Sequence, residues 1–170
     1  MQWIGALIVL AATTWAGFDL AAKFKQRPQQ IRQWKNAIQM IEAEMVYGQS
    51  SLREVCETIQ KQLPQPIARF FAELIADYGK KTDDFSQLWE DHIHLHWKQN
   101  ALDQNEKEIL IQFGNTLGQH DLIHQQKQIR LTLSHLEREL EDAVTMFHQY
   151  HQMARGLGVL SGLLVIILII

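Results

Sequence analysis

Apolar side chains recur at steps of three and four residues through the middle of the chain, which is the period of a helix with one buried face. The first stripe consists of Ile31, Trp34, Ile38, Ile41 and Met45. Pro28 precedes this stripe and Gly48 follows it. Because proline suits the first position of a helix and glycine its end, the pattern predicts a helix that begins at Pro28 and ends near Gly48.

Four more stripes follow, each bounded by residues that begin or end helices. They predict helices from Ser50 or Ser51 to Leu63, from Pro66 to Gly79, from Asp83 or Asp84 to Trp97, and from Asp103 to Leu117. A sixth helix is predicted from Asp121 and meets no proline or glycine until Gly156, so it should continue toward the C-terminus. Together these elements predict an all-α, antiparallel bundle of about six helices over residues 23–155.

Both ends of the chain are apolar. Residues 1–18 and residues 156–170 carry no charged side chain. A bilayer core requires about 20 apolar residues, so residues 1–22 are predicted to form a transmembrane helix. Residues 156–170 would extend about 22 Å as a helix, which predicts a second, marginal transmembrane helix. A cleaved signal peptide is the alternative for the first segment, and it is disfavoured because no basic residue precedes the apolar run.

Basic residues cluster directly after the first apolar segment, with no acidic residue before Glu42. They are Lys23, Lys25, Arg27, Arg32 and Lys35. Because basic residues stay on the cytoplasmic side of a membrane, the bundle is predicted to face the cytoplasm from the cell membrane. The same residues would attract anionic lipid headgroups. Nucleic acid is disfavoured as a partner, since the formal net charge is -3.

The sequence lacks the motifs of common catalytic and cofactor sites, including phosphate-binding glycine loops, GxSxG, HExxH and CxxC. We therefore expect a protein that is not an enzyme and has no cofactor. The run HIHLH places His92 and His96 one helical turn apart, with His94 between them. Two ligands do not complete a metal site, so the run predicts a polar helix face, with metal binding as the alternative.

Acidic residues are the candidates for partner binding. Glu42 and Glu44 follow the basic stretch on the first predicted helix, where they can bind a partner or pair with basic residues of the same helix. A second acidic group on the long helix is predicted to face solvent and consists of Glu137, Glu139, Glu141 and Asp142. The single cysteine, Cys56, has no partner for a disulfide and is predicted to be a small buried residue.

The stretch FGNTLGQHDLIHQQKQI, residues 113–129, resembles the Phe-Gly-x-x-Leu-Gly-x-x-Asp-x-x-x-Gln motif of the stage III sporulation protein AB family of endospore-forming bacteria. Further residues that look like hallmarks of this family are Gly5, Arg27, Pro28, Glu42, Glu44, Tyr47, Gly48 and Leu52. The resemblance implies a mother-cell membrane protein of a secretion-like complex between mother cell and forespore. It implies a bundle similar to the cytoplasmic domains of type II secretion platform proteins, with the secretion-type ATPase of the complex as partner.

The motif also has an interpretation from the residues themselves. Gly118 is predicted to end one helix, Asp121 to cap the next, and Gln125 to brace the corner between them. Direct contact of Asp121 and Gln125 with a partner is the alternative. For the whole chain, the alternatives to an ATPase-docking platform are a histidine-based metal-binding protein and a membrane protein that binds anionic lipids.

Overall fold

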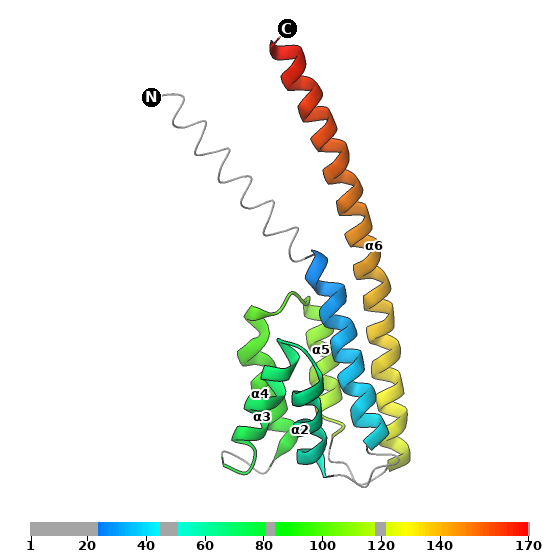
Figure 1. Ribbon diagram of the computed structural model, residues 1–170. Helices are drawn as coiled ribbons and strands as arrows, with labels where there is room; N and C mark the ends of the chain where they lie inside the picture. The colour runs from blue at the N-terminus through cyan, green and yellow to red at the C-terminus, as the bar shows by residue number, and fades with distance from the viewer. Residues whose placement is uncertain (1–23, 45–50, 81–83, 118–121, 170) are drawn as a thin grey trace.

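The computed structural model of the protein describes residues 24–44, 51–80, 84–117 and 122–169 (Figure 1). In these residues the regular elements are six α-helices and one short 3₁₀-helix. They are the first helix over residues 24–43, α2 (Leu52–Gln62), α3 (Ile67–Asp77), α4 (Phe85–His96), η2 (Trp97–Gln99), α5 (Gln104–Gly114) and α6 (Leu122–Ile169). The prediction of an all-α fold with about six helices is therefore confirmed.

Three of the predicted helix-bounding residues have the expected contacts or backbone. The Ser51 hydroxyl accepts a hydrogen bond from the Glu54 N–H, and the Glu54 carboxylate accepts one from the Ser51 N–H. Asp84 Oδ1 accepts from the Ser86 N–H at 3.0 Å. These contacts satisfy N–H groups that have no partner within the first turn of a helix. After α3, Gly79 has φ +81°, a left-handed conformation that glycine adopts readily.

Two predicted helix boundaries are wrong. The first helix does not begin at Pro28, because residues 24–27 are already helical. A proline removes one hydrogen bond from a helix interior, and the buried Pro28 ring gains packing in return. α5 ends at Gly114 and not at Leu117, since the Leu117 N–H bonds to the Gly114 carbonyl at 3.1 Å in a turn.

Aromatic rings occupy the centre of the core, where the first helix, α3, α4 and α5 meet. Trp34 packs against Phe70 and Trp89 with ring centroids 5.0 and 5.9 Å apart, and Trp89 lies 5.6 Å from Phe113. These pairs meet edge to face, an arrangement that the charge distribution of aromatic rings favours. The Trp89 Nε1–H donates to the Leu110 carbonyl at 2.8 Å, so the buried indole joins α4 to α5.

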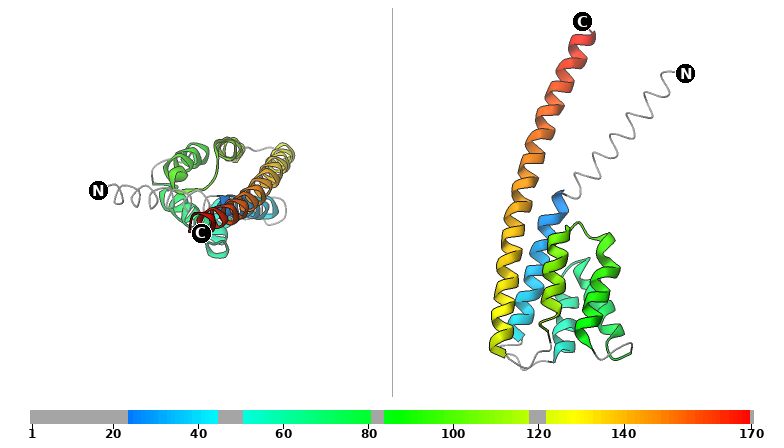
Figure 2. Two further views of the ribbon diagram at one scale, coloured as in Figure 1. Left: turned by 90° about the horizontal axis from the view of Figure 1, so that it is seen from above. Right: turned by 180° about the vertical axis from the view of Figure 1, so that it is seen from behind.

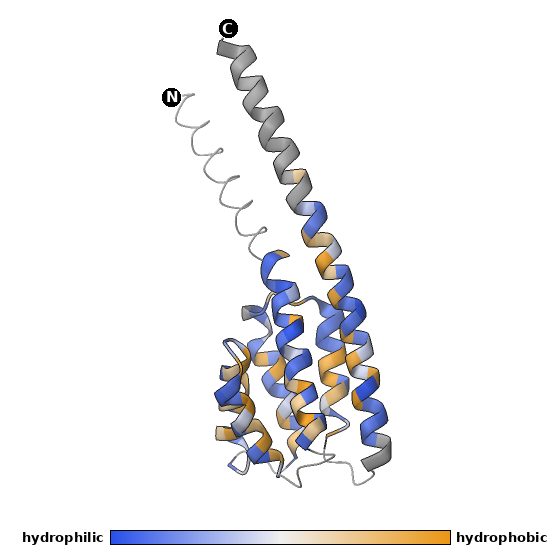
Figure 3. Ribbon diagram, turned by 45° about the vertical axis from the view of Figure 1, so that its right-hand side comes forward, coloured by the Kyte–Doolittle hydropathy of each residue, from blue (hydrophilic) through white to orange (hydrophobic). Residues whose placement is uncertain are grey.

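The first helix and α6 lie side by side and run antiparallel (Figures 1 and 2). α6 is continuous and extends well beyond the bundle at its C-terminal end, and residue 24 lies toward that same end of the bundle. Figure 3 shows hydrophobic residues mainly on helix faces that turn toward the interior, with hydrophilic residues on the outside. This distribution follows from apolar residues spaced at three and four positions.

Of the two predicted membrane segments, the structure describes only the C-terminal one. Residues 1–22 lie outside the described residues, and residues 156–169 form the C-terminal part of α6. Within the described part of the chain, none of the helices has the combined length and hydropathy that crossing a membrane requires.

Candidate partner-binding surface

Ion pairs set the register between the first helix and α6. Lys35 pairs with Glu137, and further along the first helix Glu42 Oε1 lies 3.5 Å from Arg130 Nε. Residue numbers rise along the first helix as they fall along α6, as an antiparallel pair requires. Arg130 and Glu137 are largely exposed, and exposed pairs contribute only about 0–1 kcal/mol each. These ion pairs therefore fix how the two helices are aligned, but they add little to the stability of the bundle.

A buried ion-pair cluster joins the first helix to both α5 and α6. Arg27 is only 7% exposed. Its Nη2 and Nε atoms lie 2.7 and 2.9 Å from Glu106 Oε1, and Nη2 also lies 3.3 Å from Glu139 Oε2. Arg27 Nη1 lies 3.1 Å from Asp103 Oδ2. A buried guanidinium is tolerated when its donors meet acceptors in this way, so the cluster fastens three helices at one point.

Glu106 has a second role at the start of α5. Its Oε2 atom accepts a hydrogen bond from the Asp103 N–H at 2.7 Å, while Oε1 receives Arg27. Burial raises the pKa of Glu106, and the Arg27 guanidinium opposes that rise. One carboxylate thus both holds the first turn of α5 and pairs with the first helix.

The predicted basic cluster is divided by this arrangement. Arg27 is enclosed by carboxylates of the protein, and Lys35 pairs with Glu137. Lys25 and Arg32 are exposed, whereas Lys23 lies outside the described residues. Attraction to lipid headgroups therefore remains a prediction for the exposed pair. Because Arg27 is buried against carboxylates of the bundle, its charge does not contribute to this attraction.

The predicted solvent-exposed acidic group on the long helix is wrong at one position. Glu139 is buried because it faces Arg27, whereas Glu137, Glu141 and Asp142 are exposed. The charges along α6 alone could not predict that Glu139 is buried, because its partner Arg27 belongs to the first helix. Burial of Glu139 is made favourable by a cation 112 positions away in the sequence.

The corner between α5 and α6 contains Gln125, which is buried. Its Nε2 atom donates a hydrogen bond to the Thr116 carbonyl at 3.1 Å. This contact agrees with the interpretation of Gln125 as a brace between the two helices. Asp121 and Gly118 lie outside the described residues, so the cap predicted for Asp121 and partner contact at either residue stay predictions.

Glu42 and Glu44 lie where the first helix ends, away from the C-terminal end of α6 (Figure 1). Both are partly buried. Glu42 pairs with Arg130 of α6, and within the described part of the chain it has no ion pair with a basic residue of its own helix. The salt bridge is long at 3.5 Å and the Arg130 side chain is 70% exposed, so a competing basic group can reach Glu42 from solvent.

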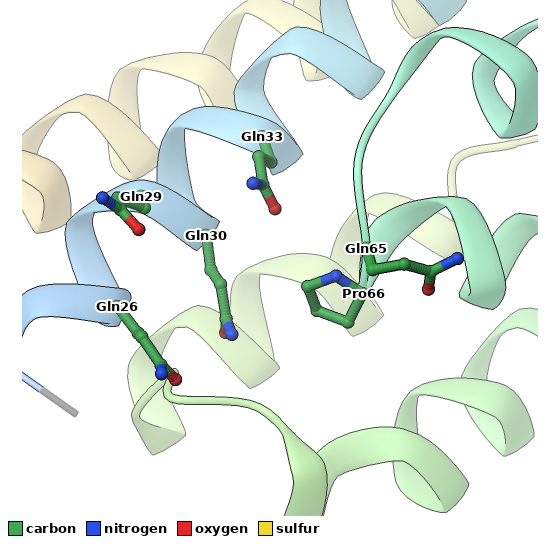
Figure 4. Close-up of a pocket in the computed structure, with 6 residues that line it drawn as sticks. All are labelled: Gln26, Gln29, Gln30, Gln33, Gln65 and Pro66. Carbon is green, nitrogen blue, oxygen red and sulfur yellow. The ribbon is translucent and has the colours of Figure 1, made fainter. Parts of the chain in front are cut away.

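A cavity of about 410 Å³ lies between the first helix and the turn that joins α2 to α3 (Figure 4). Five of its six lining residues are glutamines: Gln26, Gln29, Gln30, Gln33 and Gln65, together with Pro66. Its amide groups can donate and accept hydrogen bonds, but they supply no acid, base or nucleophile. This lining suits hydrogen-bonded contact with a polypeptide better than catalysis.

Two of these glutamines differ in their hydrogen bonding. Gln30 Oε1 accepts from the Ala101 N–H at 2.8 Å, whereas the buried Gln33 Oε1 has no hydrogen-bond partner among the described residues. Sequence reasoning missed this cavity. The signal was present, because Gln26, Gln29, Gln30 and Gln33 follow the spacing of one helix face.

The polar helix face predicted for the HIHLH run is wrong for two of its three histidines. His92 and His96 are buried, whereas the His94 side chain is 52% exposed and lies 3.7 Å from Glu90. Carboxylates of α3 meet the buried pair: His92 Nε2 lies 3.1 Å from Asp77 Oδ2, and His96 Nε2 lies 2.9 Å from Glu73 Oε2. The prediction failed because these carboxylates belong to another helix.

Cys56 is buried on α2, as predicted. Burial raises the pKa of its thiol to about 12. Arg53 lowers this pKa and Glu57 raises it, but both effects are smaller than that of burial. The thiol is therefore protonated at neutral pH and behaves as a small apolar side chain.

The fold matches that of a helical class of bacterial sporulation proteins. A solved structure of stage III sporulation protein AB is similar to this chain, with 41% sequence identity and a TM-score of 0.68. The match covers 72% of this chain and 97% of that structure. At this identity the likeness extends beyond the fold to the sequence.

Two sequence comparisons give the family itself. The family model of stage III sporulation protein AB matches residues 2–170. Stage III sporulation protein AB of Bacillus subtilis (strain 168) is 40% identical over 169 residues, which are 99% of this chain and 99% of that protein. The chain belongs to the stage III sporulation protein AB family, and the prediction from its motif is confirmed.

Proposed function

We propose that this chain is a non-catalytic membrane platform of a secretion-like sporulation complex, and that its bundle docks a cytoplasmic secretion-type ATPase. Residues 1–22 and 156–170 anchor it in the mother-cell membrane, with the bundle in the cytoplasm. Family membership supports the sporulation role. The resemblance of the bundle to cytoplasmic domains of type II secretion platform proteins supports the ATPase as partner.

The arrangement of the first helix and α6 is the observation that carries the proposal. The two helices run side by side, and residue 24 and the C-terminal end of α6 lie toward the same end of the bundle (Figure 2). A chain whose apolar ends follow these helices can hold the bundle against one membrane surface. The opposite end of the bundle is then directed away from the lipid.

We call this opposite end the docking end and define it by Glu42, Glu44 and Gln125. Glu42 and Glu44 give it negative charge, which attracts a basic surface of a partner and orients it. Gln125 holds the adjoining corner through a partly buried hydrogen bond to the Thr116 carbonyl. At the membrane end, the exposed Lys25 and Arg32 contribute about 1 kcal/mol each in attraction to anionic headgroups.

Binding of the ATPase to the full chain in detergent micelles tests the docking end. In the double variant Glu42→Lys and Glu44→Lys, the local charge is reversed. We expect the affinity for the ATPase to fall at least about tenfold, or about 1.4 kcal/mol. Helix content and melting temperature, measured by circular dichroism, report whether the variant is still folded.

A matched control reverses two exposed acidic residues elsewhere, in the double variant Glu141→Lys and Asp142→Lys. These residues lie near the middle of α6, away from the docking end. The control should bind the ATPase as the unaltered chain does. Equal loss in both variants would mean that net charge, and not the docking end, governs binding. No ATPase binding by the unaltered chain would refute the proposed partner.

A further inference from the structure

The structure assigns a divalent metal site, with Zn²⁺ as the favoured ion, to Glu73 of α3 and to His92 and His96 of α4. One potential ligand atom from each residue lies within 4.8 Å of the other two. Imidazole nitrogens and a carboxylate oxygen form the His₂Glu set that binds Zn²⁺ in three-ligand sites, where water occupies the fourth position. This site is separate from the docking end and does not depend on the ATPase.

The two histidines are held in place for shared coordination. They lie one turn apart on α4, and their rings are nearly parallel, with an angle of 20° and centroids 5.9 Å apart. Phe70 lies edge-on to both rings, at 6.2 Å from His92 and 6.1 Å from His96. Buried imidazoles next to an apolar ring lose the competing contact with bulk water, which strengthens binding of a cation.

Glu73 presents one oxygen to the histidines and the other to a cation of the protein. Arg69 Nε lies 2.7 Å from Glu73 Oε1, which leaves Oε2 facing His96 Nε2 at 2.9 Å. That close approach lacks the alignment of a hydrogen bond, since His96 Nε2 makes none among the described residues. Oε2 is therefore placed beside His96 as a potential metal ligand.

The ligand separations require only a small closure around an ion. In a tetrahedral site with bonds of about 2.1 Å, neighbouring ligand atoms lie about 3.4 Å apart. Glu73 is 37% exposed and at the edge of the cluster, so rotation of its side chain can supply the movement. A cavity of about 20 Å³, lined in part by His96 and Phe70, adjoins the site and has room for one water molecule.

Asp77 completes the surroundings of the site. Its Oδ2 atom lies 3.1 Å from His92 Nε2. Metal-binding histidines commonly contact a carboxylate that fixes the orientation of the ring and raises its basicity. Asp77 is therefore assigned as a positioning residue, and an ion at the three ligands would join α3 to α4.

Calorimetric titration with Zn²⁺ tests the site in the untagged full chain, purified in detergent micelles and treated with a chelator. We expect one equivalent of Zn²⁺ to bind, and Co²⁺ to give visible absorption bands of a nitrogen- and oxygen-ligated site. Glu73→Gln should weaken Zn²⁺ binding about tenfold or more, and so should Asp77→Asn. Glu73 is partly exposed, so its variant should remain folded, which circular dichroism checks.

His94→Gln is the matched control, because His94 belongs to the same helix but is exposed. Its Zn²⁺ affinity should equal that of the unaltered chain. The assignment is overturned if the unaltered chain shows no saturable Zn²⁺ binding. It is also overturned if Zn²⁺ binds but Glu73→Gln has no effect, or if His94→Gln weakens binding as much as Glu73→Gln does. The last two results would mean that Zn²⁺ binds to other residues of the chain.

Discussion

Gly114→Ala should destabilise the bundle, because an added methyl group has no space at this position. A Cβ atom there would lie 2.1 Å from Trp89 Cδ1 and 2.7 Å from its Cγ, whereas nonbonded carbons need about 3.5 Å. Trp89 is fully buried and its Nε1–H is bonded to the Leu110 carbonyl, so it cannot withdraw without loss. Overpacking costs about 1–3 kcal/mol and a lost hydrogen bond about 1 kcal/mol, which predicts a free energy of unfolding lowered by about 2–4 kcal/mol.

Thermal unfolding of the full chain in detergent, followed by circular dichroism, measures this loss. For a bundle of this size, a decrease of about 3 kcal/mol corresponds to a melting temperature lower by roughly 10 °C. Gly79→Ala is the control, because the nearest atom to its added Cβ, Arg53 Nη2, lies 3.9 Å away. Only its positive φ opposes alanine, at a cost of about 1 kcal/mol.

A double-variant cycle with Trp89→Ala separates the clash from other effects. This substitution removes the Cδ1 and Cγ atoms that an added Cβ at residue 114 would meet, so Gly114→Ala should cost less when Trp89→Ala is present. An unchanged melting temperature for Gly114→Ala would refute the reasoning. The same loss with and without Trp89→Ala would show that the contact with the indole is not its cause.

Three further predictions concern buried charge and the thiol. Arg27→Met leaves the carboxylates of Glu106 and Glu139 buried without their cation, and should lower the free energy of unfolding by about 3–5 kcal/mol in urea denaturation at neutral pH; adding Glu106→Gln should restore part of the loss, and strictly additive losses would contradict this. Burial raises the pKa of Glu106 above its ordinary value of 4.5, so just above pH 4.5 the folded chain still holds a proton that the unfolded chain has lost. The free energy of unfolding should therefore fall as the pH rises from 4.5 through the pKa of the folded chain. Glu106→Gln should remove this dependence on pH. Cys56, whose pKa burial raises to about 12, should react with a thiol reagent at pH 8 only after denaturation, and rapid labelling of the folded chain would contradict its burial.

The helices could be predicted because the signals that begin and end them are local. Ser51 and Asp84 bond to N–H groups within one turn, and Gly79 adopts its left-handed conformation two residues after α3 ends. Apolar spacing identified the inward faces for the same reason. The end of α5 was misplaced at Leu117 because a turn of three residues follows Gly114 before the chain reaches the next glycine.

Contacts between helices could not be predicted from the spacing of residues within a single helix. Arg27 follows an apolar segment and resembles other membrane-flanking basic residues, but its partner Glu106 lies 79 positions away. Glu73 and His96 likewise come from different helices, so spacing within HIHLH could not indicate the third ligand. The glutamine spacing did mark one helix face. Whether such a face borders solvent or a cavity depends on what packs opposite, here the turn at Gln65.

The uninterrupted course of α6 has a mechanical consequence. At 1.5 Å per residue, the 48 residues from Leu122 to Ile169 form a rod about 70 Å long. Its first half is clamped by Glu137, Glu139 and Arg130, while the second half projects from the bundle. A tilt of about 5° in the projecting half moves its tip by about 3 Å, and the rod transmits the corresponding torque without a hinge. A displacement imposed at the tip therefore acts first on the buried Arg27–Glu139 contact, which is the one of these contacts nearest to the projecting half.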